Sequence, residues 1–311
     1  MITSFTLLQL EYVVAVDTWR HFALAAEKCF ITQPTLSMQI QKLERDLGVL
    51  LFDRSKQPVI PTEVGLAIIE QAKQILKEAG RIPEMVSEMR GKVEGEIRLG
   101  IIPTIAPYLM PLFINKFLKK YPGIKLIIHE LITEEIIDRL KKGQLDSGIL
   151  STPLDEKSIR EEPLFYEEFV VYLSKDDKSI SKKYLLPKDI DVSRLWLLEE
   201  GHCFRSQIMN LCELRKASGE DKRFDYETGS IETLKMMVEL NHGITILPEL
   251  SVDGLSAAQK KMVRRFKAPA PMREVSIVTH RNFIKVKIIN ALKEEILHAI
   301  PDVMKSRSNT G

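Results

Sequence analysis

The sequence of 311 residues has few cysteines, no long apolar run and no N-terminal signal pattern. Its three cysteines are too few to staple a chain of this length, so any disulfide is expected to be transient and functional. The longest uncharged apolar stretch, 99–115, contains three prolines and is too short for a membrane span. No basic segment precedes an apolar core at the N-terminus. We therefore expect a cytoplasmic protein with no membrane partner.

The sequence also lacks the motifs of nucleotide and metal chemistry. No glycine-rich loop leads to a lysine and a hydroxyl residue, and the six histidines show no paired spacing typical of a metal site. We expect no cofactor and no metal. The formal net charge of +2 shows no excess of basic residues, so charge alone would not indicate a nucleic-acid-binding protein.

Helical patterns fill the N-terminal part of the chain. Apolar residues at helical spacing predict a helix over 7–16, and strong helix formers predict a second over 21–29. A third helix, capped by Thr32, is expected to run to Leu47, before a glycine. Its apolar residues share one face: Leu36, Ile40, Leu43 and Leu47. Two helices joined by a tight turn form a helix-turn-helix, and residues 50–60 indicate a small hairpin or wing.

A long helix is predicted from Thr62 onward. Its apolar residues follow a heptad spacing: Ile68, Ala72, Ile75, Ala79, Ile82, Val86 and Met89. This stripe either packs on its own domain or joins two chains in a coiled coil, and its narrowness favours the coiled coil. Gly80 and Pro83 are expected to break or kink the helix near residues 80–82, which would confine the coiled-coil seam to its first half.

From residue 95 onward, short apolar strands alternate with helices. Strands are expected at 97–102, 125–130, 145–150, 169–173, 195–198, 243–247 and 275–279, and helices near 107–120, 133–142, 204–217, 231–241 and 284–298. The alternation predicts α/β units with a mostly parallel sheet. Such sheets bind ligands beyond the carboxyl ends of their strands, which places residues 103–104, 130–133 and 151–152 near a candidate pocket, with Thr104, Thr133 and Ser151 among them.

Two cysteines lie nine residues apart around the helix expected at 204–217. Cys203 stands at the mouth of that helix beside His202 and Arg205, and cationic neighbours together with a helix N-terminus favour a thiolate. Cys212 falls on the apolar face of the helix, about 13 Å away, whereas a disulfide needs Cα atoms roughly 4.4 to 6.8 Å apart. Oxidation of one thiol and attack by the other would therefore require the helix to unfold. The alternative is two inert cysteines, one of them a small core residue.

Residues 5–65 resemble the N-terminal domain of the LysR-type transcriptional regulators. The resemblance is carried by Phe22–Ala26, Thr32–Ser37, Ile40, Leu43–Glu44, Leu47–Gly48, Leu51–Arg54 and Pro61–Gly65. Further segments are similar to the peroxide-sensing members of that family: Gly100–Thr104, Pro107–Pro111, His129–Glu130, Gly201–Cys203, Cys212, Ser230–Leu234 and Gly243–Pro248. The similarity spans nearly the whole chain.

The resemblance implies an α/β protein with an N-terminal all-α winged helix-turn-helix and a regulatory domain of two α/β subdomains like periplasmic binding proteins. The implied division is a DNA-binding domain at 1–61, a dimerising linker helix and hinge at 62–94, a regulatory domain at 95–301 and a tail at 302–311. Within the regulatory domain, the first subdomain would span about 95–165 and 269–301, and the second about 166–268. Expected partners are double-stranded DNA with palindromic half-sites, a second copy in a homodimer, a homotetramer, and RNA polymerase.

Site residues follow from the same resemblance. Cys203 would be the peroxidatic cysteine and Cys212 the resolving one of a reversible disulfide that activates oxidative-stress genes. Peroxide would be bound by Thr104, Thr133, His202, Cys203 and Arg205. Without the resemblance, Thr133 could equally cap a helix and Thr104 could end a strand. Ser206 stands where the family often has aspartate, which leaves open how the departing hydroxide is protonated.

The resemblance also assigns a DNA-reading surface to the third helix. The residues that would face the groove are Thr32, Gln33, Pro34, Thr35, Ser37, Met38 and Gln41, while Arg54 and Lys56 would contact backbone phosphates. The same residues are compatible with two other functions. One is a regulator whose cleft binds a metabolite through Thr104, Thr133 and Ser151, and the other is a thiol enzyme such as a peroxidase, which would have no need of a recognition helix.

Overall fold

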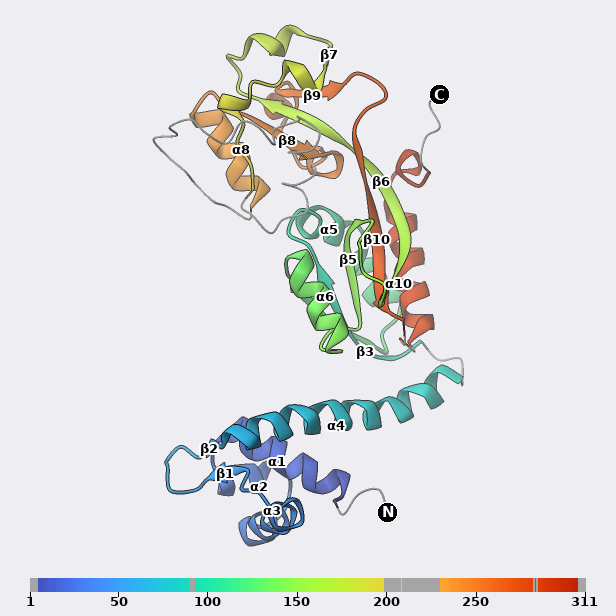
Figure 1. Ribbon diagram of the computed structural model, residues 1–311. Helices are drawn as coiled ribbons and strands as arrows, with labels where there is room; N and C mark the ends of the chain where they lie inside the picture. The colour runs from blue at the N-terminus through green and yellow to red at the C-terminus, as the bar shows by residue number, and fades with distance from the viewer. Residues whose placement is uncertain are drawn as a thin grey trace. The chain divides into compact units, whose positions relative to one another are not determined.

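The computed structural model describes residues 5–89, 93–198, 208, 230–281, 283 and 285–306. The chain divides into two compact units, Met1–Met89 and Arg90–Gly311 (Figure 1). The cysteine-bearing helix expected at 204–217 lies outside the described residues, apart from Ile208.

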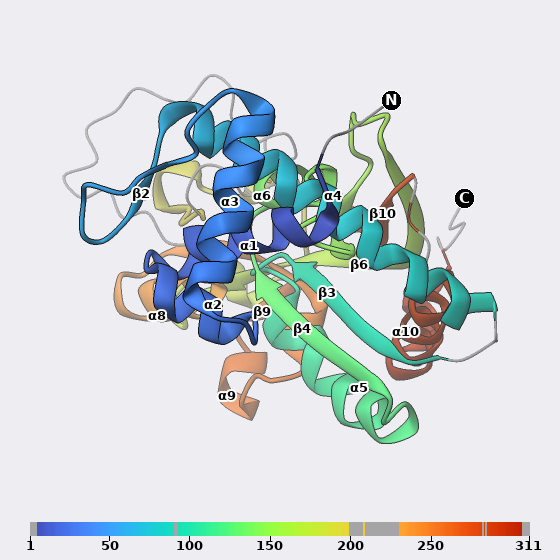
Figure 2. The same ribbon diagram turned by 90° about the horizontal axis from the view of Figure 1, so that it is seen from below.

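The first unit is helical and carries one small hairpin. It consists of α1 (Leu7–Trp19), α2 (Phe22–Lys28), α3 (Gln33–Leu47), the strands β1 (Phe52–Asp53) and β2 (Ile60–Pro61), and α4 (Glu63–Met89) (Figures 1 and 2). The side chain of Thr32 caps α3 by accepting the Thr35 N–H at 3.5 Å. Gly48 ends α3 in the left-handed conformation, with φ 71°. The predicted helices, the cap of α3 and the antiparallel wing are confirmed.

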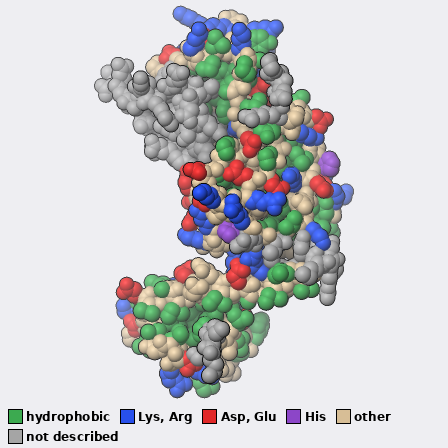
Figure 3. All heavy atoms as spheres, turned by 45° about the vertical axis from the view of Figure 1, so that its right-hand side comes forward, with side chains coloured by type: hydrophobic (Ala, Val, Ile, Leu, Met, Phe, Trp, Pro, Cys, Tyr) green, Lys and Arg blue, Asp and Glu red, His purple; other side chains and the backbone are tan. Residues whose placement is uncertain are grey.

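A hydrophobic core holds these four helices together. Leu36, Ile40 and Leu43 of α3 are completely buried against α1 and α2. Leu47 is 36% exposed, because it lies in the last turn, beyond the helices that cover the rest of α3. Figure 3 shows hydrophobic side chains gathered over this unit on the face in view. Exposed apolar residues of α1 and α4 include Leu7, Leu8, Val64, Leu66 and Ile82.

The long helix α4 does not break where the sequence suggested. It continues from Glu63 to Met89 through both Gly80 and Pro83 (Figure 1). The ring of Pro83 removes one N–H from the helical ladder, but the hydrogen bonds on either side can hold the helix together. In its first half, Ala72 is buried and Ile68 and Ile75 pack on the core of their own unit, whereas Ile82 and Val86 are exposed.

The second unit is built from α/β elements around one eight-stranded sheet. In chain order it contains β3 (Gly95–Ile101), α5 (Ala106–Lys120), β4 (Ile124–Glu130), α6 (Thr133–Lys141), β5 (Ser147–Thr152), β6 (Ile159–Leu173), β7 (Tyr184–Leu185), α8 (Ile231–Leu240), β8 (Ile244–Pro248), the short helix η5 (Glu249–Val252), α9 (Ala257–Lys260), β9 (Val263–Phe266), β10 (Met272–His280) and α10 (Val286–Ala299). The strand expected at 195–198 is reduced to a single bridge between Leu195 and Ile244.

The sheet is mixed rather than mostly parallel. Its strand order is β4-β3-β5-β10-β6-β9-β7, with β8 also paired to β6. β3 runs parallel to β4 and β5, but β10 is antiparallel to β5 and β6, and β6 is antiparallel to β8 and β9. The expectation was wrong because alternation indicates parallel pairing only where a helix crosses over between strands. No helix separates β5 from β6 or β9 from β10.

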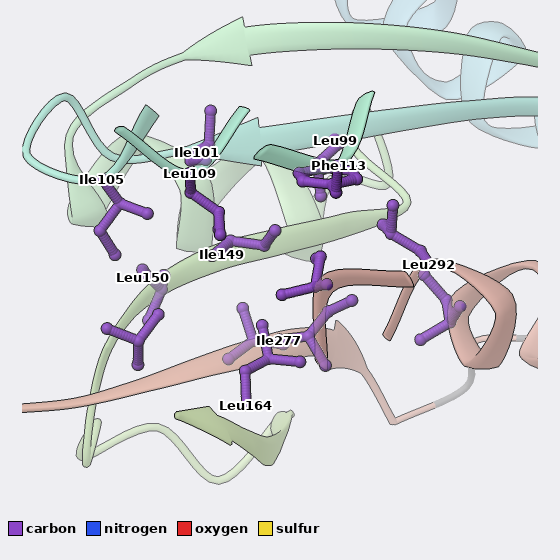
Figure 4. Close-up of a cluster of buried hydrophobic side chains, with 14 of the residues drawn as sticks. Leu99, Ile101, Ile105, Leu109, Phe113, Ile149, Leu150, Leu164, Ile277 and Leu292 are labelled. Carbon is purple, nitrogen blue, oxygen red and sulfur yellow. The ribbon is translucent and has the colours of Figure 1, made fainter. Parts of the chain in front are cut away.

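Two hydrophobic cores lie along this sheet, and β6 passes from one to the other. Its residues Ile159, Leu164 and Phe165 belong to the first core, and its last five residues, 169–173, belong to the second. Figure 4 shows the first core, where Leu99 and Ile101 of β3 meet Leu109 and Phe113 of α5. Met304 is buried in the same core, so packing extends past residue 301.

Helix α6 lies unusually close to the sheet. A Cβ atom on Gly148 would lie 2.6 Å from Cγ2 of Ile136, and one on Gly100 would lie 2.9 Å from Cγ1 of the same residue. Glycine is therefore required at both positions because the Ile136 side chain of α6 approaches the backbone of the strand closely, and not because the backbone has a special φ angle. This packing fixes the first turn of α6 against the carboxyl end of β3 and the start of β5.

Candidate functional site

The exposed face of α3 carries the residues expected to read DNA. Thr32, Gln33, Pro34, Met38 and Gln41 are exposed, while Thr35 and Ser37 are half-buried. The buried residues Leu36, Ile40 and Leu43 fix the opposite face against α1 and α2. The helix is thus amphipathic, and its polar side is uncharged up to Gln41 and then carries the exposed residues Lys42, Arg45 and Asp46. That arrangement suits insertion of the N-terminal half of a helix into a DNA groove.

Arg54 of the wing is held by three groups of its own domain. Its guanidinium donates to Oγ of Ser37 at 3.1 Å and to Oε2 of Glu44 at 2.9 Å, and it lies 4.8 Å from the centre of the Phe22 ring. Glu44 is buried and also accepts the Leu51 N–H at 2.9 Å. Arg54 therefore braces the wing against α3, which fixes its guanidinium beside the reading surface. Lys56 is exposed in the turn of the wing.

The predicted polar pocket residues of the second unit follow neighbouring parallel strands. Ile101 of β3 pairs with Glu130 of β4 and with Ile149 of β5. The ladder continues beyond β3 and β4, since Leu131 N donates to Ile101 O at 3.1 Å. Thr104, Thr133 and Ser151 consequently lie at one edge of the sheet, as predicted from the carboxyl ends of the strands.

Thr104 contacts a buried ion pair that the sequence did not reveal. Arg273 of β10 donates to the Thr104 hydroxyl at 2.9 Å and to the Thr104 carbonyl at 3.1 Å. The same guanidinium pairs with Glu167 of β6 at 2.6 Å, and both charged side chains are at most 1% exposed. Glu167 also accepts the Leu250 N–H at 3.1 Å. The Glu167 carboxylate therefore holds η5, and the Arg273 guanidinium holds the loop after β3, against the long strands β6 and β10.

The other hydroxyls at this edge have partners of their own. Ser151 donates to the carbonyl of Glu274 at 3.1 Å, and the Thr152 hydroxyl lies 2.7 Å from the Glu274 carboxylate. Thr133 is buried as the first residue of α6, whose cap is Ile132 without a side-chain bond. Thr133 therefore does not cap the helix, contrary to one of the two sequence interpretations.

A tyrosine links the two cores next to this cluster. Tyr108 of α5 packs against both cores and donates to Oε1 of Glu232, in the first turn of α8, at 2.8 Å. Burial, and then the hydrogen bond to Glu232, raises the pKa of Tyr108 above its ordinary value, so the phenol stays protonated near neutral pH. Glu232 also pairs with Lys235 at 2.6 Å. The bond fixes the start of α8 against α5.

The remaining predicted site residues, His202, Cys203, Arg205 and Cys212, lie outside the described residues. Ile208, between the two cysteines, is described and is 1% exposed in the second core. Among the described residues, no group of three His, Cys, Asp or Glu side chains could hold a metal ion. No helix in the described part of the chain is long and apolar enough to cross a membrane.

The chain matches known proteins over nearly its full length. Residues 7–66 match the bacterial regulatory helix-turn-helix proteins of the lysR family, and residues 90–300 match the LysR substrate binding domain. A hydrogen peroxide-inducible genes activator from Pectobacterium carotovorum subsp. carotovorum is 35% identical, over 86% of this chain and 88% of the relative. The HTH-type transcriptional regulator EstR of Acinetobacter baylyi is 34% identical, over 89% of this chain and 91% of EstR.

A solved structure agrees in fold as well as in sequence. A full-length OxyR mutant from Pseudomonas aeruginosa superimposes with a TM-score of 0.73 at 34% identity, covering 95% of this chain and 99% of OxyR. The helix-turn-helix indicates DNA binding, and the family is one of regulators, so the thiol-enzyme hypothesis falls away. The chain therefore belongs to the LysR family of bacterial transcriptional regulators and is of the OxyR-like type.

Proposed function

We propose that this regulator senses hydrogen peroxide through a reversible disulfide between Cys203 and Cys212 and, when oxidised, activates oxidative-stress genes. The observation that carries the proposal is the 35% identity to a peroxide-inducible genes activator over 86% of the chain. Thr104, Thr133, His202 and Arg205 would bind the peroxide beside Cys203. The position of Thr104 supports this role, since it is buried and polar at the edge of the sheet where ligands of α/β folds bind.

The chemistry balances within two thiols and one peroxide. The Cys203 thiolate attacks one peroxide oxygen, the O–O bond breaks, and hydroxide leaves as Cys203 becomes a sulfenic acid. The Cys212 thiol then attacks the sulfenic sulfur, forming the disulfide and releasing water. The hydroxide takes up the proton that Cys203 lost on ionisation, so peroxide is reduced to two waters while the two thiols are oxidised. An ordinary cellular dithiol reductant would reverse the change.

The first experiment is an intact mass and free-thiol count of the reduced full-length protein after one equivalent of hydrogen peroxide. We expect the parent to lose two thiols and two hydrogens rapidly. Cys203→Ser should lose none, and Cys212→Ser should gain one oxygen at Cys203. Persistence of all three thiols in the parent would overturn peroxide sensing.

Cys29 supplies the matched control. Burial, and then the nearby charge of Glu11, raises the pKa of Cys29 above its ordinary value, so it is a poor thiolate near neutral pH. Cys29→Ser should therefore oxidise at the same rate as the parent and lose the same two thiols. Loss of the Cys29 thiol in place of the other two would contradict the assignment.

A second candidate is a regulator that responds to a metabolite in its cleft. It is favoured by the match of residues 90–300 to the LysR substrate binding domain. Thr104 accepts from Arg273 and Ser151 donates to the carbonyl of Glu274, so under either candidate a ligand would share these hydroxyls with the protein. A thermal shift of the Cys203→Ser, Cys212→Ser double variant by small molecules from a bacterial extract, together with unchanged thiols in the parent, would favour this candidate.

The assembly is also a proposal. We place the DNA-binding domain at 1–61, the linker helix at 62–94 and the regulatory domain at 95–301, with its second subdomain at about 166–268. The exposed apolar residues of α4, including Ile82 and Val86, support a homodimer through this helix. A twofold dimer would bind palindromic half-sites, and two dimers would form a tetramer in the cytoplasm. Thr32, Gln33, Pro34, Thr35, Ser37, Met38 and Gln41 would face the groove, with Arg54 and Lys56 on phosphates.

A further inference from the structure

One aromatic residue of the helix-turn-helix has an unusual position. Phe30, in the turn between α2 and α3, is 96% exposed, more than any other large hydrophobic side chain in the described part of the chain. An aromatic side chain is among the largest apolar surfaces a residue can offer, and leaving it in water forfeits that burial. The stability of the domain therefore does not explain why a phenylalanine stands at this position.

The backbone conformation of Phe30 is one that a phenylalanine rarely adopts. The residue has φ 56°, in the left-handed region. Phe30 N donates to Glu27 O at 3.1 Å and Ile31 N donates to Ala26 O at 3.0 Å. These two bonds form the motif that ends a helix with a left-handed residue, which is usually glycine. A phenylalanine here is strained and exposed, and a strained residue at a helix end points to a role outside folding.

Phe30 lies close along the chain to the residues expected to read DNA. It lies two residues before Thr32, the cap of α3, and is followed by the exposed residues Gln33 and Pro34. The N-terminal end of a recognition helix is the part that meets base edges in the major groove. The ring is thus continuous along the chain with the DNA-reading surface of the family.

The part of this surface nearest to Phe30 is uncharged, and the first basic residues of α3 are Lys42 and Arg45, toward its C-terminal half. No Asp, Glu, Lys or Arg occurs between residues 29 and 41. Arginine and lysine recognise guanine, glutamine recognises adenine, and apolar side chains recognise the methyl group of thymine. A surface of Gln33, Gln41, Met38 and Phe30 therefore fits A·T pairs.

We propose that the Phe30 ring contacts the 5-methyl group of one thymine in each operator half-site and so helps to set DNA sequence preference. Burial of one methyl group changes affinity by about fourfold for each half-site. The contact is apolar, so it should contribute little to the salt dependence of binding.

The test uses the full-length reduced protein and two stages. In the first, wild-type protein and Phe30→Gly each select sites from a library of random-sequence DNA duplexes, and the selected sites are sequenced. In the second, each thymine of the wild-type site is replaced by deoxyuridine, which removes only the methyl group. We expect wild-type protein to lose about fourfold per half-site at one thymine position, and Phe30→Gly to be insensitive to that methyl.

Two controls separate the contact from folding. Phe30→Gly should melt no lower than wild type, because glycine adopts the left-handed conformation without strain. Leu8→Ala, which removes another exposed apolar side chain of the same unit, should keep the wild-type response to every methyl. A Phe30→Gly variant that responds to all methyls as wild type does, that weakens binding equally at all sequences, or that changes only self-association would overturn the proposal.

Discussion

At the scale of single residues, the most consequential pair is Glu167 and Arg273. Both side chains are almost completely buried, and each also serves a neighbouring group, Leu250 N–H and Thr104 respectively. Burying one charge without its partner is far more expensive than burying a hydrogen-bonded pair. The pair therefore makes the loop carrying Thr104 dependent on two strands that are distant in sequence.

A substitution of Glu167 tests this dependence. Glu167→Ala would leave the guanidinium of Arg273 buried and unpaired, and should lower the free energy of unfolding by about 3 to 5 kcal/mol. Denaturant unfolding of the full-length protein measures the change. Glu168→Ala is the matched control, because this neighbouring carboxylate pairs with the exposed Arg265 and its loss should change stability by less than about 1 kcal/mol. Equal effects of the two variants would contradict the buried-pair argument.

At the scale of elements, α4 combines two roles along one helix. Its first half completes the core of the helical unit through Ile69 and Ala72, whereas its second half exposes Ile82 and Val86. The helix continues past Pro83, although proline removes one backbone hydrogen bond. The second half should therefore open more readily than the first.

Hydrogen exchange can measure this local weakness. Pro83→Ala restores a backbone N–H inside α4, and a helix-interior proline is worse than alanine by about 3 kcal/mol. Exchange of the amides that follow position 83 should slow by roughly tenfold or more. Gly80→Ala is the control in the same helix, since the added Cβ meets no atom within 4 Å, and it should slow exchange less. Unchanged exchange in Pro83→Ala would show that the proline does not limit the helix.

At the scale of the whole molecule, association through α4 is the property to test. Ile82 is 64% exposed and makes no contribution to the core of its own unit, so a charge there should spare the fold. Ile82→Glu should shift the protein toward monomers in sedimentation, because a carboxylate in an apolar helix seam is costly to bury. Leu240→Glu, at an exposed leucine in the second unit, should leave the association unchanged. A dimer that survives Ile82→Glu would place the interface elsewhere.

The sequence by itself determined the helical unit and most elements of the second unit. Caps and stops such as Thr32 and Gly48 act within a few residues, and apolar periodicity marks the buried face of α3. The position of Thr104 beyond β3 also followed from local signals, since strand ends and parallel neighbours can be recognised along the chain. The family resemblance added the roles of Cys203 and Cys212, which remain proposals.

Only the tertiary structure decided which distant residues meet. Glu167 and Arg273 are separated by 106 positions, and neither carries a local signal that it will be buried with the other. The antiparallel direction of β10 and the passage of β6 through two cores likewise depend on how the chain returns to the first core. The left-handed turn at Phe30 depends on the junction of α2 and α3. Local patterns specify elements because their interactions are short-range, whereas pairing and burial depend on contacts between elements that form only when the chain has folded.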